Sequence, residues 1–437
     1  MADDRNDFFY APELELLPRD QLRALQLARL TDTVTRAYER VPHYQAAMKE
    51  VGVTPQDIRG LDDIRRLPFT TKDCLRSNYP FGMFAVPREQ VVRLHASSGT
   101  TGLPTVVGYT AKDIDTWTEL MARSMACAGA RPGDVAHNAN QYGMFTGGLG
   151  FHYGAERLGC TVTPMSGGNT ARQLMLMRDF GATVLIANPS YAFKLAEAAE
   201  ESGIDIKSKL RVGLFGAEPW SDAMRAEIES RLGIITGDFW GLSEMTGPGV
   251  SVNCIGGHGL HVWEDCFFIE IVDPVTMEPL GDGEIGEIVI TTLAKQAQPI
   301  LRYRTRDLSS LSHEPCSCGR THARIQRVVG RSDDMLIIRG VNVFPSQIET
   351  VLLAVPGVVP HYELVVHQEG PMVAMTVRVE ASPQLGQGEY AGVAAVVRDR
   401  IKSAVGVTVH VDVTAPGALP RWEVGKAVRV RDLRRSA

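Results

Sequence analysis

The chain of 437 residues lacks the features of several large protein classes. No apolar run approaches the roughly 18 residues that a membrane-spanning helix needs, so the sequence predicts no membrane partner. The opening residues, MADDRNDFFY, are acidic and contain no apolar core of a secretory signal. The seven cysteines are odd in number and irregularly spaced, which favours reduced thiols over a disulfide framework. Together these absences predict a cytoplasmic location.

Charge and motif content exclude further classes. The formal net charge is −6, without the basic excess typical of nucleic-acid binding, so we expect no nucleic-acid partner. The chain contains no G-x-S-x-G, H-E-x-x-H or kinase catalytic-loop pattern, which leaves serine hydrolase, zincin and protein kinase unsupported. GDGEIG, 281–286, matches a dinucleotide fingerprint by letters, but it precedes a strand pattern and carries two acidic residues. A hairpin turn is therefore favoured there.

Apolar periodicity changes along the chain and predicts two domains. From about 90 to 300, short apolar runs such as ATVLIAN and RVGLFGA alternate with helical patterns, which predicts α/β layers with ligand-binding loops at strand ends. FFIEIVDPV and GEIGEIVITTL predict a hairpin or small β-sheet. Beyond Gly330, strands and one helix over 389–404 predict a small α+β domain. We therefore expect a large domain over 1–330 and a small domain over 331–437.

HASSGTTGLPT, 95–105, has the composition of a phosphate-binding loop without its lysine. Gly99 and Gly102 allow backbone N–H groups to approach a phosphate closely. Hydroxyl donors come from Ser97, Ser98, Thr100 and Thr101. A Walker A loop has lysine directly after its second glycine, whereas this loop has Leu103. Taken alone, the segment also fits an ordinary surface turn.

Three further segments add candidate nucleotide contacts. In DFWGLSEMTGPG, 238–249, Trp240 can stack on a base and Glu244 can hold a magnesium ion that bridges phosphates. In RYRTRDLS, Asp307 follows an arginine-rich turn, where its carboxylate can accept both ribose hydroxyls. In EVGKAVR, Lys426 lies in a glycine-flanked loop. Each segment taken alone also has a structural explanation: a buried Trp–Glu pair for the first, a surface ion pair for the second and a solvated lysine for the third.

Together these segments resemble acyl-adenylate-forming enzymes, and specifically the phenylacetate–CoA ligase branch. The resemblance rests on SSGTTGLPT, DFWGLSE, YRTRD, GRSDDMLIIRGVNVFPSQIE and GKAVRV in that order, supported by LPFTTKD, FTGGLGFHYGAERLG and GAEPW. It runs from Leu17 to Val430. It implies the adenylate-forming fold, which has a large N-terminal domain of α/β layers with a small β-sheet subdomain, and a small mobile α+β C-terminal domain.

The resemblance implies an ATP-dependent aryl acid–CoA ligase. An arylacetate or benzoate-type acid would attack the α-phosphate of ATP, giving an acyl-adenylate and pyrophosphate, and CoA would then displace AMP. The resemblance also implies Mg²⁺ and a homodimer. An enzyme that loads the pantetheine of a carrier protein is a same-fold alternative, and a non-catalytic nucleotide-binding relative is an alternative of another class. Retention of Glu244, Asp307 and Lys426 argues against the last.

Motif matching assigns residues to the implied reaction. Lys426, Glu244 and Thr246 would be catalytic: Lys426 bridges the acid carboxylate and the α-phosphate, and Glu244 binds magnesium. The set implied for ATP and AMP is Ser97, Ser98, Gly99, Thr100, Thr101, Gly102, Ala217, Glu218, Pro219, Asp238, Trp240, Gly241, Ser243, Asp307 and Arg331. The set implied for the acyl pocket is Tyr142, Phe145, Gly147, Gly148, Phe151 and His152. Phe151 stands where relatives usually have a small residue. Asp333 would be the hinge and Gly340 would leave room for pantetheine.

A separate group of residues has the chemistry of a metal site. PCSCGRTH offers Cys316 and Cys318, and NCIGGHGLH offers Cys254, His258 and His261. Three thiolates and one imidazole would form a tetrahedral zinc set that leaves no open position, so the expected zinc is structural. The spacing of the cysteine and histidine in relatives selects His261 and leaves His258 as the alternative ligand. Reduced cysteines in a loop are the competing interpretation.

Overall fold

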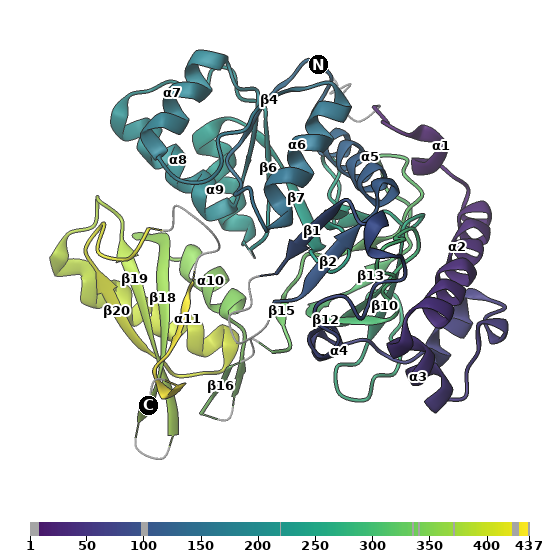
Figure 1. Cartoon of the computed structure of the whole chain (residues 1–437). Helices are drawn as coiled ribbons and strands as arrows, with labels where there is room; N and C mark the ends of the chain where they lie inside the picture. The colour runs from purple at the N-terminus through teal and green to yellow at the C-terminus, as the bar shows by residue number, and fades with distance from the viewer. Residues whose placement is uncertain are drawn as a thin grey trace. The chain divides into compact units, whose positions relative to one another are not determined.

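The computed structural model describes residues 8–97, 104–218, 220–333, 336–339, 341–369, 372–421 and 428–435. The chain divides into two compact units (Figure 1). The first comprises Met1–Ala187, Ile204–Ala217 and Ile234–Arg327, and the second Asn188–Gly203, Glu218–Gly233 and Val328–Ala437. These units differ from the two domains predicted from the sequence, 1–330 and 331–437, and that division remains a prediction.

A nine-stranded sheet forms the centre of the first unit, in the order β13-β14-β9-β8-β7-β6-β5-β3-β4. Strands β4, β3, β5, β6 and β7 are parallel neighbours, and the strands from β7 to β13 run antiparallel. The bounds are β3 Val135–Asn138, β4 Thr161–Thr163, β5 Val184–Ala187, β6 Val212–Gly216, β7 Ile235–Leu242, β8 Gly247–Val252, β9 Leu260–Val262, β13 Leu311–Ser312 and β14 Arg324–Ile325.

Local sequence explains the parallel half of this sheet. The four residues of β5, Val-Leu-Ile-Ala, are all buried, as expected for a strand covered on both faces. The helices of this unit that follow its strands are α5 Ala111–Cys127, α6 Thr146–Leu158 and α7 Thr170–Phe180. Thr110 caps α5 by accepting from the N–H of Asp113, whose carboxylate accepts from the N–H of Thr110 at 2.8 Å.

Smaller elements complete the first unit. The hairpin of β1 Arg93–Ala96 and β2 Val106–Tyr109 flanks the predicted phosphate loop. Strands β10 Phe267–Val272, β11 Gly286–Thr292 and β12 Tyr303–Ser309 pair antiparallel in a second sheet. GDGEIG leads into β11, whose first residue is Gly286, and so closes the connection from β10, as a hairpin requires. Toward the N-terminus lie α1 Pro12–Glu15, α2 Arg19–Arg40, α3 Pro42–Glu50, α4 Lys72–Ser77 and the 3₁₀ turns Pro55–Asp57, Leu61–Arg66 and Arg88–Gln90.

The second unit contains a four-stranded sheet in the order β20-β19-β18-β21. Its core is aliphatic, with Leu364, Val377 and Ile401 fully buried. The elements are α8 Pro189–Ser202, α9 Asp222–Leu232, β15 Gly330–Arg331, β16 Leu336–Ile338, β17 Val341–Val343, α10 Pro345–Leu353, β18 Val358–Glu369, β19 Met372–Ala381, α11 Tyr390–Val405, β20 His410–Thr414 and β21 Val430–Asp432, with 3₁₀ turns Gln387–Glu389 and Leu433–Arg435.

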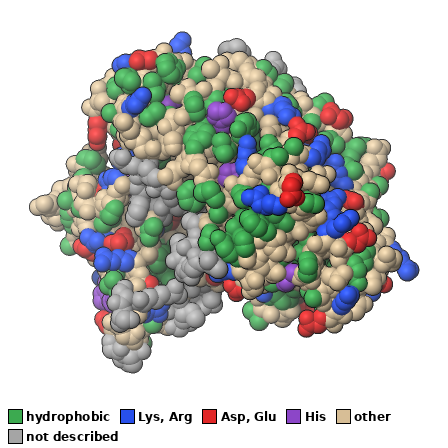
Figure 2. Space-filling view, in the orientation of Figure 1, with side chains coloured by type: hydrophobic (Ala, Val, Ile, Leu, Met, Phe, Trp, Pro, Cys, Tyr) green, Lys and Arg blue, Asp and Glu red, His purple; other side chains and the backbone are tan. Residues whose placement is uncertain are grey.

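The architecture confirms the expected fold class. Mixed α/β layers with a small β-sheet precede a small α+β part, and the helix expected over 389–404 is α11. None of the helices in the described ranges is long and apolar enough to cross a membrane. Acidic and basic side chains both occur across the face shown in Figure 2, which fits the modest net charge.

Candidate functional site

Parallel topology brings the motifs of the large domain to one edge of the sheet. Strands β3, β6 and β7 are parallel, and their carboxyl ends are followed by the segments that contain Tyr142, Ala217 and Glu244. Ligands bind at this edge in open α/β sheets. Ala217 has a φ of 71°, a left-handed conformation that costs free energy for a residue with a Cβ. Such backbone strain is typical of functional loops.

Glu244 lies in the tight connection between β7 and β8 and is only 5% exposed. Its Oε1 accepts from the hydroxyls of Thr105 and Tyr303, each at 3.4 Å. The N–H of Ser97 donates to the carbonyl of Thr105 at 3.0 Å, so the two sides of the phosphate-loop motif are joined there. Glu244 therefore contacts the base of that motif. The loop residues Ser98, Gly99, Thr100, Thr101, Gly102 and Leu103 lie outside the described residues.

Trp240 and Asp307 come together from two different sheets. The indole Nε1 of Trp240, in β7, donates to Oδ2 of Asp307, in β12, at 2.9 Å. Asp307 is 8% exposed, and its N–H donates to the hydroxyl of Thr305. Asp238 pairs with Arg327 at 3.3 Å. The two residues that motif matching places against adenine and ribose are thus direct neighbours.

Ser243, Thr246 and Gly241 lie in the same turn as Glu244. The hydroxyl of Ser243 is 3.3 Å from that of Thr146. Thr246 Oγ1 is buried and has no hydrogen-bond partner among the described residues, an arrangement that leaves its donor available to a ligand. A Cβ on Gly241 would lie 2.2 Å from the carbonyl oxygen of Gly247, so only glycine fits there.

The predicted acyl-pocket residues occupy α6 and the segment before it. The amide of Asn138 donates to Tyr142 Oη at 2.9 Å, and that hydroxyl is 3.1 Å from Nδ1 of His152. Burial raises the pKa of Tyr142 to about 12, so its hydroxyl stays protonated. Phe151 is buried, with its ring centroid 4.9 Å from that of Phe239.

The remaining acyl-pocket residues differ in exposure. Phe145 is exposed and is the N-cap residue of α6, and Gly147 has open space beside it. A Cβ on Gly148 would lie 2.4 Å from the carbonyl oxygen of Gln141. The assignment of these residues to an acyl pocket remains a prediction.

The other predicted residues belong to the second unit. Arg331 forms a bidentate pair with Asp333, at 2.9 and 3.0 Å, so the expected brace and hinge residues bind each other. Glu218 accepts from the N–H of Ser190 at 2.7 Å. Pro219, Gly340 and Lys426 lie outside the described residues, and their roles stay predictions.

Several residues that surround Glu244 are not predicted by the motifs. Thr105 and Tyr303 contact its carboxylate, and the ammonium of Lys295 donates to its carbonyl oxygen at 2.9 Å. Thr105 is the last residue of HASSGTTGLPT, and Tyr303 is the second residue of RYRTRDLS. Their positions within these motifs could therefore have identified them. Lys295 is 51 positions from Glu244 and belongs to no motif. Only the fold reveals it.

Comparison with known proteins places the chain in a family. The model of the AMP-binding enzyme family matches residues 37–294, and that of the AMP-binding enzyme C-terminal domain matches residues 340–434. The chain is 52% identical to the phenylacetate–coenzyme A ligase of Thermus thermophilus, over 98% of this chain and 100% of that protein. It belongs to the AMP-binding enzyme family, in the phenylacetate–CoA ligase branch.

Two further relatives support this placement. The phenylacetate–coenzyme A ligase of Escherichia coli is 52% identical, over 96% of this chain and 97% of that one. A crystal structure of 2-hydroxyisobutyryl-CoA ligase in its postadenylation state is 29% identical, with a TM-score of 0.92, covering 100% of this chain and 94% of that chain. The resemblance stated from the motifs is therefore confirmed for the family and the fold.

This AMP-binding enzyme also assembles the predicted metal-ligating residues. Donor atoms of Cys254, His261, Cys316 and Cys318 lie within 4.8 Å of one another. The Cys254 and Cys316 sulfurs are 3.6 Å apart, close to the roughly 3.7 Å expected between thiolates on one tetrahedral zinc. Nδ1 of His261 is 3.1 Å from the carbonyl oxygen of His322, and Nε2 is 3.3 Å from the Cys318 sulfur. His258 is exposed and outside this group.

The electrostatics of the four residues also fit a cation. Burial lowers the pKa of His261, but the neighbouring thiols of Cys316 and Cys318 outweigh it, and the pKa is raised overall. Such a group accumulates negative charge in a confined space, which a divalent cation would neutralise. The donor set and its geometry therefore fit zinc.

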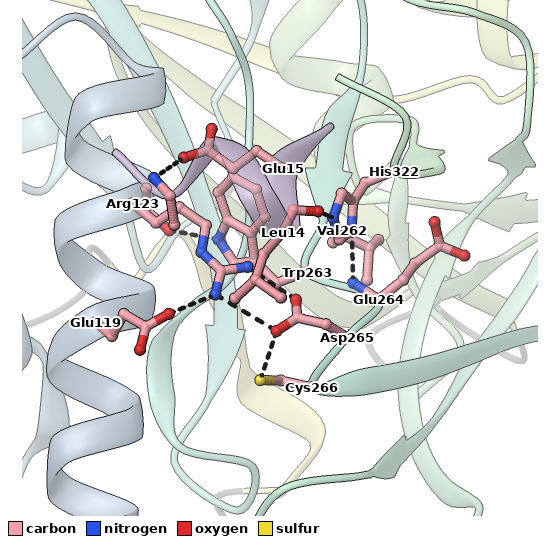
Figure 3. A network of polar contacts seen from close by, with 12 residues as sticks. Leu14, Glu15, Glu119, Arg123, Val262, Trp263, Glu264, Asp265, Cys266 and His322 are labelled. Atoms are coloured by element: carbon pink, nitrogen blue, oxygen red, sulfur yellow. Dashed lines mark hydrogen bonds and ion pairs between the residues drawn. The ribbon is translucent and has the colours of Figure 1, made fainter. Parts of the chain in front are cut away.

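A buried ionic network connects this region to the N-terminal helices (Figure 3). Arg123 binds Asp265 at 2.8 Å, and both side chains are 1% exposed. Burial alone would raise the pKa of Asp265, but Arg123 holds it well below its usual range. Arg320 pairs with the buried Glu15 of α1 at 2.7 Å. We interpret this network as structural.

Proposed function

We propose that this protein is an ATP-dependent aryl acid–CoA ligase. It would join an arylacetate or benzoate-type acid to ATP, release pyrophosphate, and transfer the acyl group from AMP to CoA. The observation that carries the proposal is that the chain is 52% identical, over nearly its full length, to two phenylacetate–coenzyme A ligases. The hydrogen bond between Trp240 and Asp307 supports it, as does the contact of Glu244 with Tyr303 on the same strand as Asp307.

The described residues suit specific parts of this chemistry. Glu244 would bind the Mg²⁺ that accompanies ATP, since carboxylate oxygens are its preferred protein ligands. Thr246 would offer the α-phosphate a buried hydroxyl that has no partner within the part of the chain that the structure describes. Asp307 would accept from the ribose hydroxyls, with Trp240 against the base. Adenylation needs phosphates held and neutralised more than it needs acid–base catalysis.

The experiment that tests the proposal is an acid panel. The purified protein is incubated with ATP, Mg²⁺ and CoA plus phenylacetic, benzoic, hydroxybenzoic or aminobenzoic acid, and products are analysed by mass spectrometry. We expect an aryl-CoA and AMP with at least one acid. If none of these acids gives either an adenylate or a thioester, the proposal is refuted. Adenylate without CoA transfer would instead favour a carrier-protein pantetheine as acceptor.

We also propose that Cys254, His261, Cys316 and Cys318 hold a structural zinc ion. Four protein ligands would saturate the metal, so it would cross-link the chain and take no part in the reaction. Elemental analysis of protein purified without added metal should find about one zinc per chain. A content near zero in freshly purified, folded protein would exclude it.

The homodimer implied by the resemblance belongs to the same proposal. Sedimentation velocity at micromolar concentration should find twice the 47.7 kDa mass of the chain, and a monomer would contradict it. The cytoplasmic location predicted from the sequence remains an expectation.

A further inference from the structure

Lys295 is a buried lysine directly beneath the Glu244 turn. Lys295 is 3% exposed and lies on the segment that follows β11. Nζ donates to the carbonyl oxygen of Glu244 at 2.9 Å and lies 5.1 Å from the ring centroid of Tyr109. Lys295 and Thr246 also line the same small cavity. The ammonium therefore contacts the main chain of the turn that presents the proposed magnesium ligand.

Burial of this ammonium is costly, and no ion pair with another described residue compensates for it. Lysine is almost never fully buried without a partner, because its charge loses hydration. Within the described part of the chain Lys295 forms no salt bridge. Its contacts are one carbonyl and one aromatic face, a weak cage for a full charge. An apolar residue of similar volume would be more stable there, so a lysine at this position indicates use of its donor or charge.

Two further side chains hold the same segment in the same manner. The hydroxyl of Tyr109 donates to the carbonyl of Thr246 at 2.9 Å, and the indole of Trp117 donates to the carbonyl of Pro248 at 2.9 Å. Tyr109 and Trp117 are stacked and almost completely buried. Carbonyls at alternate positions, 244, 246 and 248, are thus each fixed by one buried donor. Lys295 binds the first of these carbonyls, that of Glu244, the residue whose carboxylate is the proposed magnesium ligand.

We propose that Lys295 is a positioning residue for the adenylation half-reaction, holding the main chain of Glu244 so that its carboxylate stays directed at the Mg²⁺–nucleotide. This inference rests on the proposed function, in which Glu244 binds that ion. A fixed ligand loses less freedom when the metal binds, so removing the Lys295 donor weakens magnesium binding and slows the step that depends on it.

The charged and titratable groups facing Lys295 come from several elements. Asp113 of α5 and the Glu244 carboxylate act on its charge from a distance, and both raise its pKa. Burial is the larger influence and lowers that pKa to about 7. Tyr109 presents its ring face, His95 of β1 is close enough to interact with the lysine charge, and Cys266 lines the shared cavity. The Arg36 guanidinium donates to the Lys295 carbonyl at 3.3 Å.

The test compares three variants with the wild-type protein. Lys295→Met keeps the aliphatic stem and removes the donor, and Tyr109→Phe removes only the hydroxyl that holds the neighbouring carbonyl. Lys112→Met is the matched control, because Lys112 is an exposed lysine on α5. ATP–pyrophosphate exchange is measured against Mg²⁺ concentration with an accepted acid. Thioester formation from a supplied aryl-adenylate is measured separately, and thermal unfolding reports folding.

Lys295→Met should lower the exchange rate about 10- to 100-fold, the range for losing a hydrogen bond from a charged donor, and should raise the Mg²⁺ concentration for half-maximal rate. Thioester formation from the supplied adenylate and the KM for the acid should stay within about twofold, since neither would depend on Glu244. Tyr109→Phe should shift the Mg²⁺ requirement in the same direction by less, and Lys112→Met should match wild type.

Several outcomes would overturn the inference. A folded Lys295→Met with wild-type Mg²⁺ dependence would do so, as would equal losses in both half-reactions that follow lost stability. If Lys295→Met does not fold, an unchanged Mg²⁺ requirement in Tyr109→Phe decides against it. A wild-type protein that adenylates no acid would refute the proposed function itself, a result distinct from active wild type with insensitive variants.

Discussion

At the scale of single residues, the site depends on polar groups held in nearly dry surroundings. Glu244 is 5% exposed and Asp307 8%, and each is contacted by a donor from a different element. Ionic and hydrogen-bonding interactions are stronger where water is excluded, so small shifts of these groups have large effects. Lys295 is the extreme case, because it is 3% exposed and has no salt-bridge partner among the described residues.

This burial gives Lys295 a predictable effect on stability. Burial lowers its pKa from 10.5 to about 7, so between these values the unfolded chain binds a proton that the folded chain does not. Stability of the wild-type protein should therefore rise from pH 7 toward pH 10 through this residue, and the penalty should be greatest below pH 7. Lys295→Met should be more stable than wild type near pH 6.5, and the difference should shrink by pH 9.5. If the denaturation midpoints of wild type and Lys295→Met differ by the same amount at every pH in that range, the pKa shift is contradicted.

At the scale of elements, connections between strands carry the chemistry and strands fix their positions. The β7–β8 connection presents Glu244, β12 presents Asp307, and the β8–β9 connection presents Cys254. In the last of these, a Cβ on Gly257 would lie 2.2 Å from the Cys254 sulfur. The turn therefore requires a glycine so that the thiols can converge.

Gly257→Ala should disrupt the proposed zinc group while leaving the sheet intact. The added methyl would displace the Cys254 sulfur, so we expect zinc content to fall well below one per chain and thermal stability to drop by about 1–3 kcal/mol. Elemental analysis and thermal denaturation measure the two effects. Gly392→Ala, on α11, is the control and should keep wild-type zinc, because its new Cβ would meet no other described part of the chain within 4 Å. Full zinc in folded Gly257→Ala would argue against this geometry.

At the scale of the whole molecule, the chain joins a segment that matches the AMP-binding enzyme family to one that matches its C-terminal domain. The two family models match 37–294 and 340–434, on either side of the predicted hinge at Asp333. In the proposed function the small domain carries Lys426 and serves the two half-reactions differently. A cation that is needed for only one of two steps is separable by mutation.

Lys426→Ala should therefore stop adenylation while sparing thioester formation. We expect ATP–pyrophosphate exchange to fall by at least about 100-fold, because a positive charge would no longer bridge the acid and the α-phosphate. Thioester formation from a supplied adenylate should remain near wild type. Equal loss of both half-reactions would argue against a domain that changes its role between steps.

The sequence by itself determined the family, the fold class and the nucleotide motifs, since each motif is a local string whose residue types suit phosphate, ribose or magnesium. It also identified Cys254, Cys316 and Cys318, and the spacing in relatives selected His261 over His258, a choice that agrees with the group of four donors in the structure. Only the tertiary structure brought Lys295, 51 positions from Glu244, beneath that residue's carbonyl, and joined Trp240 to Asp307 across two sheets. The physical reason is that burial and distance arise from packing of segments far apart in the chain, and neither leaves a local pattern.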